Sequence, residues 1–156
     1  MMTIRIPGAG TLQLHRLVCD YNGTLARDGV LLPGVETLLH ELAFDIDIQV
    51  ITADTFGTVE ANMTGLPVTV YVLRPGDQAA QKADLVLENG ADTVVALGNG
   101  RNDAEMLKAA ALGICLVEAE GAAMKTMQAA DIVCRSAVEA LELLSIPKRL
   151  VATLRT

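Results

Sequence analysis

Apolar and polar positions alternate in two short segments at the start of the chain. Thr3–Ile6 and Thr11–Leu14 both show this alternation, and the turn-forming residues Pro7–Gly10 lie between them. A period of two places alternate side chains on one face of a strand, so the pattern predicts a β-hairpin. The hairpin leads into the apolar run Leu17–Cys19, which predicts a buried strand that ends at Asp20.

The segment after residue 32 has the spacing of an amphipathic helix. It begins at Pro33, and its apolar residues recur at i, i+3, i+4 and i+7, namely at Val35, Leu38, Leu39 and Leu42. This spacing places the four side chains on one helical face.

Beyond this helix, apolar strands alternate with helices. Strands are expected at 46–51, 68–73, 93–97, 113–117 and 132–134. Helices are expected up to Met63, from the capping residue Asp77 to Glu88, and at 102–110, 121–130 and 138–144, followed by an amphipathic tail. Such alternation predicts an α/β, Rossmann-like fold with a parallel sheet covered by helices on both faces. Residues 27–32 are expected to form a short flap after Asp20.

Length and composition favour a single domain over residues 1–156. A chain of 156 residues buries roughly two-thirds of the surface that its unfolded form exposes. Hydrophobic residues make up 51% of the chain, whereas aromatic residues make up 3% and tryptophan is absent. The core is therefore expected to consist of Ala, Val, Leu and Ile.

The charge of the chain argues against a nucleic-acid partner. The formal net charge is −7 at pH 7, and Lys and Arg form no cluster that could neutralise a phosphate backbone. The overall charge also repels anionic substrates, so a bound phosphate must be held by local groups. His15 and His40 match no motif, and packing or solvent exposure is expected for both.

The apolar pattern predicts neither a membrane segment nor a secretory leader. The longest strongly apolar stretch, 109–117, is much shorter than the ~20 residues that span a bilayer. Charged and turn-forming residues interrupt Met1–Gly10, so we expect a cytoplasmic protein. The three cysteines, Cys19, Cys115 and Cys134, are odd in number and lack CxxC spacing, which favours buried free thiols.

Four places combine polar residues with a strand end or a helix start: Asp20, Thr52, Lys82 and the turn Gly98–Asp103. Each has an ordinary structural explanation, respectively an Asx-turn, a helix cap, a solvated lysine and a strand-to-helix turn. The helix dipole disfavours a lysine near a helix start, and pairing with a bound phosphate is the functional alternative. Because strand carboxyl ends share one edge of a parallel sheet, the four places together predict a site in one crevice.

The segment from Asp20 to Leu25 resembles the nucleophile motif of the haloacid dehalogenase-like phosphohydrolases. It reads Asp-Tyr-Asn-Gly-Thr-Leu, where the family has Asp-x-Asp-Gly-Thr-Leu. Three later segments are similar to motifs of the phosphorylation domain of P-type ATPases: Thr52–Asp54 to Thr-Gly-Asp, Gly98–Ala104 to Gly-Asp-Gly-x-Asn-Asp-Ala, and Ala129–Val133 to Ala-Ala-Asp-Val-Val. The resemblance covers most of the chain from Cys19 to Cys134. The short segments between the motifs leave no room for the cap domain of many family phosphatases.

The resemblance implies that Asp20 attacks phosphorus and forms an aspartyl-phosphate, which water then hydrolyses. It assigns Mg²⁺ to Asp20, the backbone carbonyl of Asn22 and the side chain of Asn99, with Asp103 in support. It assigns the phosphate to Gly23, Thr52, Ala53 and Lys82.

Two asparagines stand where the resemblance implies aspartates. Asn22 replaces a general acid and base, a role that typically supplies ~10²–10⁴-fold in rate. Asn99 replaces a carboxylate ligand and so removes one negative charge from the metal site. We therefore expect slow turnover and weakened Mg²⁺ binding.

Two functions are compatible with this pattern. The first is a slow Mg²⁺-dependent phosphohydrolase or phosphotransferase acting on a phosphorylated small molecule or a phosphoprotein, which the retained Asp20 favours. The alternative is a weakly active or inactive phosphate- or metal-responsive binding module that acts through a partner, which Asn22 and Asn99 favour. Because the crevice lacks a cap and the chain is rich in apolar residues, we also expect a homo-oligomer.

Overall fold

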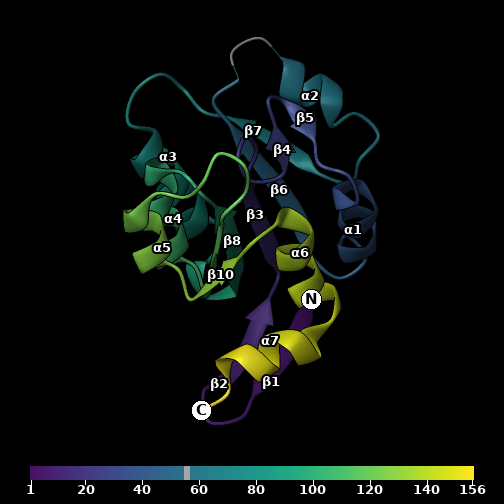
Figure 1. The fold of residues 1–156 in the computed structure, drawn as a ribbon, viewed down its shortest axis with the longest axis vertical. Helices are drawn as coiled ribbons and strands as arrows, with labels where there is room; N and C mark the ends of the chain where they lie inside the picture. The colour runs from purple at the N-terminus through teal and green to yellow at the C-terminus, as the bar shows by residue number, and fades with distance from the viewer. Residues whose placement is uncertain (55–56) are drawn as a thin grey trace.

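The computed structural model describes residues 1–54 and 57–156, which are built around a six-stranded sheet (Figure 1). All neighbouring strands run parallel, in the order β10-β9-β8-β3-β6-β7. These strands are β3 (Arg16–Asp20), β6 (Asp47–Thr52), β7 (Thr69–Val72), β8 (Val94–Gly98), β9 (Leu112–Leu116) and β10 (Ile132–Cys134). The predicted α/β fold with a parallel sheet is confirmed.

The order of the strands reverses beside β3. The chain first adds β6 and β7 on one side of β3, and then returns to add β8, β9 and β10 on the other side. Loops that leave neighbouring strands diverge at such a reversal and open a crevice beyond the carboxyl ends. Asp20, the last residue of β3, lies at this position.

Helices cover both faces of the sheet (Figure 1). One face carries α1 (Val35–Leu42) and α6 (Ala137–Ser145), and the other carries α3 (Gln78–Glu88), α4 (Ala104–Ala109) and α5 (Met124–Ala129). Along β3, Leu17 and Cys19 belong to the first core, whereas Val18 belongs to the second. The strands β8 and β9 are buried along their whole length because helices cover both of their faces.

The first two strands form the predicted hairpin. β1 (Met2–Ile6) and β2 (Gly10–Leu14) pair antiparallel, and the amphipathic tail forms the helix α7 (Pro147–Leu154) beside them (Figure 1). Leu14 and Leu150 are fully buried in the same core. The hairpin therefore extends the core below the sheet, away from Asp20.

The flap lies at the opposite end, where the strands have their carboxyl ends (Figure 1). It consists of β4 (Ala26–Arg27) and β5 (Val30–Leu31), and the short helix α2 (Thr58–Asn62) lies next to it. Asn62 Nδ2 donates a hydrogen bond of 2.8 Å to the Gly29 carbonyl of the flap. Within residues 1–54 and 57–156 these elements are too small to form a cap domain. Thr55, which was expected in the polar turn after β6, lies outside the described residues.

Three predicted helices begin later than the sequence indicates. The helix expected from Pro33 starts at Val35, after Gly34 with a φ of +86°. The segment at 102–110 opens with a 3₁₀ turn at Arg101–Asp103, and α4 follows at Ala104. The segment at 121–130 becomes helical only at Met124, because Gly121 adopts a φ of +74° and its N–H closes a 2.8 Å turn on the Glu118 carbonyl. The residues before α5 form this turn instead of a first helical turn.

Other expectations from composition agree with the structure. The three cysteines are buried and unpaired, and burial raises the pKa of the Cys115 and Cys134 thiols to about 11. His15 and His40 face solvent. In the part of the chain that the structure describes, no helix is both long enough and apolar enough to cross a membrane.

Candidate active site

Three strand ends bring polar side chains to the same edge of the sheet. Asp20 ends β3, Thr52 ends β6, and Asn99 directly follows β8. Because β3 pairs with both β6 and β8, the three residues lie on neighbouring strands. The parallel register thus brings together residues that are far apart in the chain.

Lys82 lies between two carboxylates at this edge. Its Nζ atom is 2.7 Å from Asp20 Oδ1 and 2.6 Å from Asp103 Oδ1. Only 2% of Lys82 is exposed, so the explanation of this residue as a solvated surface lysine is wrong. Two carboxylates here face one ammonium group, and the three residues together carry excess negative charge.

Asp103 also organises the loop after β8. Its Oδ2 atom accepts hydrogen bonds from the backbone N–H groups of Asn99, at 2.9 Å, and Gly100, at 2.8 Å. Gly98 permits this approach, because a Cβ atom at that position would lie 2.6 Å from the Asp103 side chain. Both oxygens of the buried Asp103 are therefore occupied by protein groups, so it positions the loop and Lys82.

The arrangement changes the pKa values of two of these groups. Burial raises the pKa of Asp20 to about 7, the Asp103 carboxylate acts in the same direction, and Lys82 opposes both. Burial alone disfavours the charge on Lys82, but Asp20 and Asp103 outweigh it and raise the pKa of the ammonium group. Near neutral pH, Lys82 is therefore charged and Asp20 is poised to gain or lose a proton.

The excess charge leads to opposite predictions for the two carboxylates. Asp20→Asn should stabilise the metal-free protein at pH 8 by about 1–2 kcal/mol, because Lys82 keeps a one-to-one pair with Asp103. Asp103→Asn should destabilise it by about 2–3 kcal/mol, because the amide NH₂ group would face either Lys82 or the loop N–H groups and leave a buried donor unsatisfied. Urea unfolding with a chelator present measures both.

The stabilisation by Asp20→Asn should depend on pH, and the pKa of Asp20 fixes the direction of this dependence. The pKa of Asp20 is about 7 in the folded protein and near 3.9 in the unfolded chain, so between these values the folded state binds more protons. Stability of the wild-type protein therefore falls as pH rises through this window, and Asp20→Asn does not share the loss. The gain should vanish at about pH 4. If Asp20→Asn and Asp103→Asn destabilise the protein equally at pH 8, the two carboxylates do not place excess negative charge around Lys82.

Asn99 is held by groups from two other loops. Its Oδ1 atom accepts from Thr24 Oγ1 at 3.4 Å, and its Nδ2 atom donates to the Gly121 carbonyl at 3.0 Å. Thr126 Oγ1 donates to the neighbouring Gly100 carbonyl at 2.6 Å. Both threonines are fully buried. Sequence reasoning did not assign them a role, because a single threonine in a loop or a helix carries no periodic pattern.

A hollow lies between the flap and the end of β6. It is lined by Asn22, Asp28, Gly29, Thr52, Ala53, Asp54, Thr58 and Val59. Asn22 Oδ1 accepts from the Gly29 N–H at 3.0 Å and so ties the first loop to the flap. Thr52 Oγ1 accepts from the Asp54 N–H at 3.1 Å, which leaves the hydroxyl hydrogen as a donor for a ligand. The predicted residues Asn22, Thr52 and Ala53 thus share one opening.

The donor set at this edge fits a hard divalent cation. Asp20 offers a carboxylate, Asn22 a backbone carbonyl and Asn99 an amide oxygen, and oxygen atoms are the ligands that Mg²⁺ prefers. The excess negative charge around Lys82 also favours a cation. Among residues 1–54 and 57–156, no group of three or more His, Cys, Asp or Glu side chains is arranged to hold a metal. The metal would therefore depend on the carbonyl and amide oxygens as well as on Asp20.

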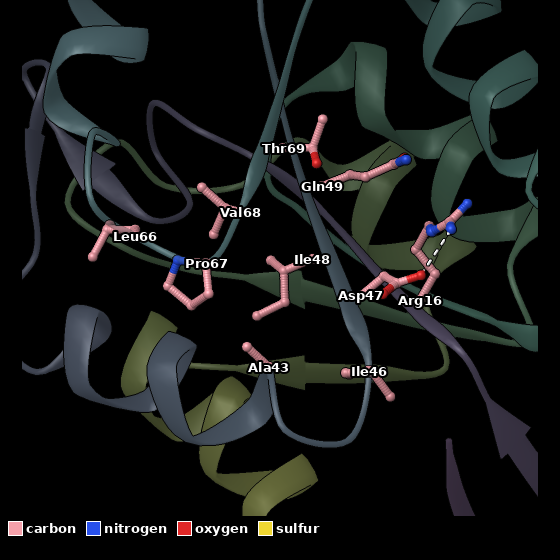
Figure 2. A pocket seen from close by; sticks show the side chains of 10 residues that line it. All are labelled: Arg16, Ala43, Ile46, Asp47, Ile48, Gln49, Leu66, Pro67, Val68 and Thr69. Carbon is pink, nitrogen blue, oxygen red and sulfur yellow. Dashed lines mark hydrogen bonds and ion pairs between the residues drawn. The ribbon is translucent and has the colours of Figure 1, made fainter.

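A second hollow lies at the other edge of the sheet, where β6 and β7 begin (Figure 2). Arg16 and Asp47 form a 3.0 Å ion pair on its rim, and Arg16 also donates to Asn89. Asp20 is at the opposite end of β3 from Arg16. This hollow is therefore separate from the candidate active site.

Comparison with known proteins gives one family and several relatives. The model of the haloacid dehalogenase-like hydrolases matches residues 81–140, which include Lys82, Asn99 and Asp103. An uncharacterized protein of Methanocaldococcus jannaschii is 46% identical over 72 residues, which are 46% of this chain and 77% of that protein. Phosphoserine phosphatase of Mycobacterium tuberculosis is 33% identical over 90 residues, which are 56% of this chain but only 22% of that protein.

A solved structure shows the same fold over almost the whole chain. The 3-deoxy-D-manno-octulosonate 8-phosphate phosphatase of Moraxella catarrhalis, solved with magnesium and phosphate ions, superposes with a TM-score of 0.69 at 15% identity. The superposition covers 91% of this chain and 94% of that chain. The family match includes the turn after β8 and most of α3, the helix that carries Lys82. Residues 81–140 therefore match the haloacid dehalogenase-like hydrolases, and the fold over 91% of the chain resembles that of the Moraxella phosphatase.

Proposed function

We propose that this protein is a Mg²⁺-dependent phosphohydrolase that transfers a phosphoryl group to Asp20. The observation that carries the proposal is the buried arrangement of Asp20, Lys82 and Asp103 at the strand reversal. A carboxylate at a crevice, held by a buried ammonium group, combines a nucleophile with a positive charge for a phosphate. A purely structural ion pair would not require a second carboxylate on the same lysine.

In the proposed reaction, one Asp20 carboxylate oxygen attacks phosphorus and the bond to the leaving oxygen breaks. Lys82 lies 2.7 Å from Asp20 Oδ1, so its charge stabilises the negative charge that the carboxylate and the phosphoryl group share. The Thr52 hydroxyl donates to a phosphoryl oxygen from the end of β6, Ala53 lines the same hollow, and the phosphate would also lie close to Gly23. Water then attacks the aspartyl-phosphate and releases phosphate.

Mg²⁺ would be held by Asp20, the Asn22 carbonyl and Asn99, and when bound it would neutralise phosphoryl charge. Asp103 supports this set indirectly, because its oxygens hold Lys82 and the N–H of Asn99. The proposal draws on the magnesium and phosphate ions bound to the Moraxella phosphatase, a relative by fold. The substrate would be a phosphorylated small molecule or a phosphoprotein.

Asn22 is the reason to propose slow turnover. Its side chain has no titratable proton, and its oxygen accepts from the Gly29 N–H of the flap. The leaving oxygen would therefore have to take its proton from water. This feature also supports the second candidate, a binding module in which Asn22 couples phosphate or metal binding to the position of the flap.

The test is a screen of phosphate esters with and without Mg²⁺, run on the wild-type protein and on Asp20→Asn. An enzyme should hydrolyse at least one small aryl or sugar phosphate slowly, only with Mg²⁺, and not at all after the substitution. The matched control is Asp92→Asn, which removes an exposed carboxylate before β8, at the opposite end of the strands from Asp20, and should leave the rate unchanged. Equal rates in the wild-type and Asp20→Asn proteins would remove the enzyme from consideration.

We further propose that the chain self-associates. Val30 follows the hollow-lining residue Gly29 on the flap and is 69% exposed, and Tyr71 and Val72 of the edge strand β7 are exposed as well. A neighbouring copy that covered these side chains would also limit the access of water to the site. Light scattering at micromolar concentration should give a dimer or larger, and a monomer mass would contradict this proposal.

A further inference from the structure

A second acidic side chain lies beside Asn99 and comes from a different loop. A Cβ atom on Gly23 would lie 2.7 Å from Glu120 Oε2, 2.5 Å from Asn99 Nδ2 and 2.7 Å from Asn99 Oδ1. The Glu120 carboxylate and the Asn99 amide thus meet above the same glycine, three residues after Asp20. Glu120 is exposed to solvent, so its carboxylate is accessible to an ion, and the φ of +77° at Gly23 also favours glycine here.

Hydrogen bonds from the Asn99 side chain and from the backbone hold the loop of Glu120 in this place. Asn99 Nδ2 donates to the Gly121 carbonyl at 3.0 Å, and the Ala123 N–H donates to the Asn99 carbonyl at 2.9 Å. The Gly121 N–H closes the turn on Glu118 at 2.8 Å. The loop after β9 is therefore attached to Asn99 at Gly121 and Ala123, directly after Glu120, and the turn that Gly121 closes on Glu118 delays the start of α5.

The charge of Glu120 has no counterpart in the protein. Among residues 1–54 and 57–156, no cation lies within ion-pair distance of its carboxylate. Glu118 of the same turn differs, because its carboxylate is 4.0 Å from Arg27 and accepts from the Ala137 N–H at 2.8 Å. Glu120 thus adds an unbalanced negative charge beside Asn99, where the proposed function needs a cation.

We propose that Glu120 supplies the carboxylate charge that position 99 lacks, so that the acidic group of the metal site comes from the loop after β9. The inference rests on the proposed function, because it concerns the Mg²⁺ site that the reaction requires. The neutral side chain of Asn99 is consistent with this role of Glu120, because an aspartate at position 99 would place a second negative charge next to the Glu120 carboxylate. Asn99 keeps an oxygen toward the site, and Glu120 provides the charge.

The test is the affinity for Mg²⁺ itself, measured by isothermal titration calorimetry without substrate. Glu120→Gln keeps the shape of the side chain and removes its charge, and it should weaken Mg²⁺ binding by about 10-fold or more. The matched control is Glu118→Gln, which removes a charge from the same turn but not from the site, and it should leave the affinity within about twofold. Melting temperatures verify that each variant is folded.

A charge exchange separates this role from a structural one. Asn99→Asp in the Glu120→Gln protein moves the carboxylate back to position 99 and should restore Mg²⁺ affinity to near the wild-type value. In the wild-type background, Asn99→Asp should increase the Mg²⁺ affinity much less, because the new carboxylate and Glu120 repel each other. The difference between the two increases measures the coupling between positions 99 and 120. Equal gains in both backgrounds would overturn the inference.

The outcomes also distinguish this inference from the proposed function. If the wild-type protein binds Mg²⁺ and Glu120→Gln binds it equally well, the inference fails and the phosphohydrolase proposal stands. If the wild-type protein binds no Mg²⁺, both fail. Weak binding by Glu120→Gln that is restored by Asn99→Asp supports the inference.

Discussion

Asn22→Asp is expected to raise the turnover of a small aryl phosphate at least tenfold, the low end of the ~10²–10⁴-fold that a general acid and base supplies. Asn22 borders the hollow that also contains Thr52, so a carboxyl group there would face the leaving oxygen. An aspartate can still accept the 3.0 Å hydrogen bond from Gly29, so the flap should keep its position. The measurement is kcat at saturating Mg²⁺ and substrate.

Two controls isolate the chemistry of this change. Asp20→Asn in the Asn22→Asp background should abolish turnover, which excludes a contaminating phosphatase. Gln13→Glu adds a carboxylate at an exposed position of β2, away from Asp20, and it should not accelerate the reaction. An Asn22→Asp protein that folds and binds Mg²⁺ yet turns over no faster than wild type would show that proton transfer does not limit the rate.

Lys82→Met is expected to lower turnover by about 10²–10³-fold, the usual effect of removing one group that stabilises charge in the transition state. Methionine fills a similar volume in the buried space but leaves Asp20 and Asp103 without their shared cation. One carboxylate should then keep a proton near neutral pH, which makes Asp20 a poorer nucleophile. The same aryl phosphate assay measures the loss.

Lys108→Met is the matched control for this substitution. Lys108 lies in the last turn of α4 and faces solvent, so removing its charge should change turnover by less than about twofold. Circular dichroism should show native helix content in both variants. Full activity in a folded Lys82→Met protein would mean that the buried ammonium group has only a structural role.

The fold could be predicted from the sequence because its strands and helices carry strong periodic patterns. The strand that ends at Asp20 and the helix that Asp77 caps agree with the structure, where Asp77 Oδ1 accepts from the Ala80 N–H at 3.1 Å. The alternation of strands and helices likewise predicted the parallel sheet that the structure contains. These features depend on local spacing, which a single sequence shows directly.

The environment of the site could be predicted only in part. From the sequence, Lys82 could be either a solvated surface lysine or a lysine that pairs with a phosphate. Its two carboxylate partners are 21 and 62 residues away, so no local pattern showed that it is buried between them. Glu120 was not identified, because it lies in a turn that periodicity treats as the start of α5. Contacts between loops depend on the assembled sheet, and no pattern along the chain encodes them.

The central claim, that Asp20 accepts a phosphoryl group, is tested most directly by beryllofluoride, which mimics that group on an aspartate. With Mg²⁺ present at saturating concentration, beryllofluoride should raise the melting temperature of the wild-type protein by about 5 °C or more, because a ligand bound at a hundred times its Kd stabilises the native state by ~2.7 kcal/mol. Asp20→Asn should show no increase under the same conditions. An equal increase in both proteins, or none in a wild-type protein that binds Mg²⁺, would contradict the account.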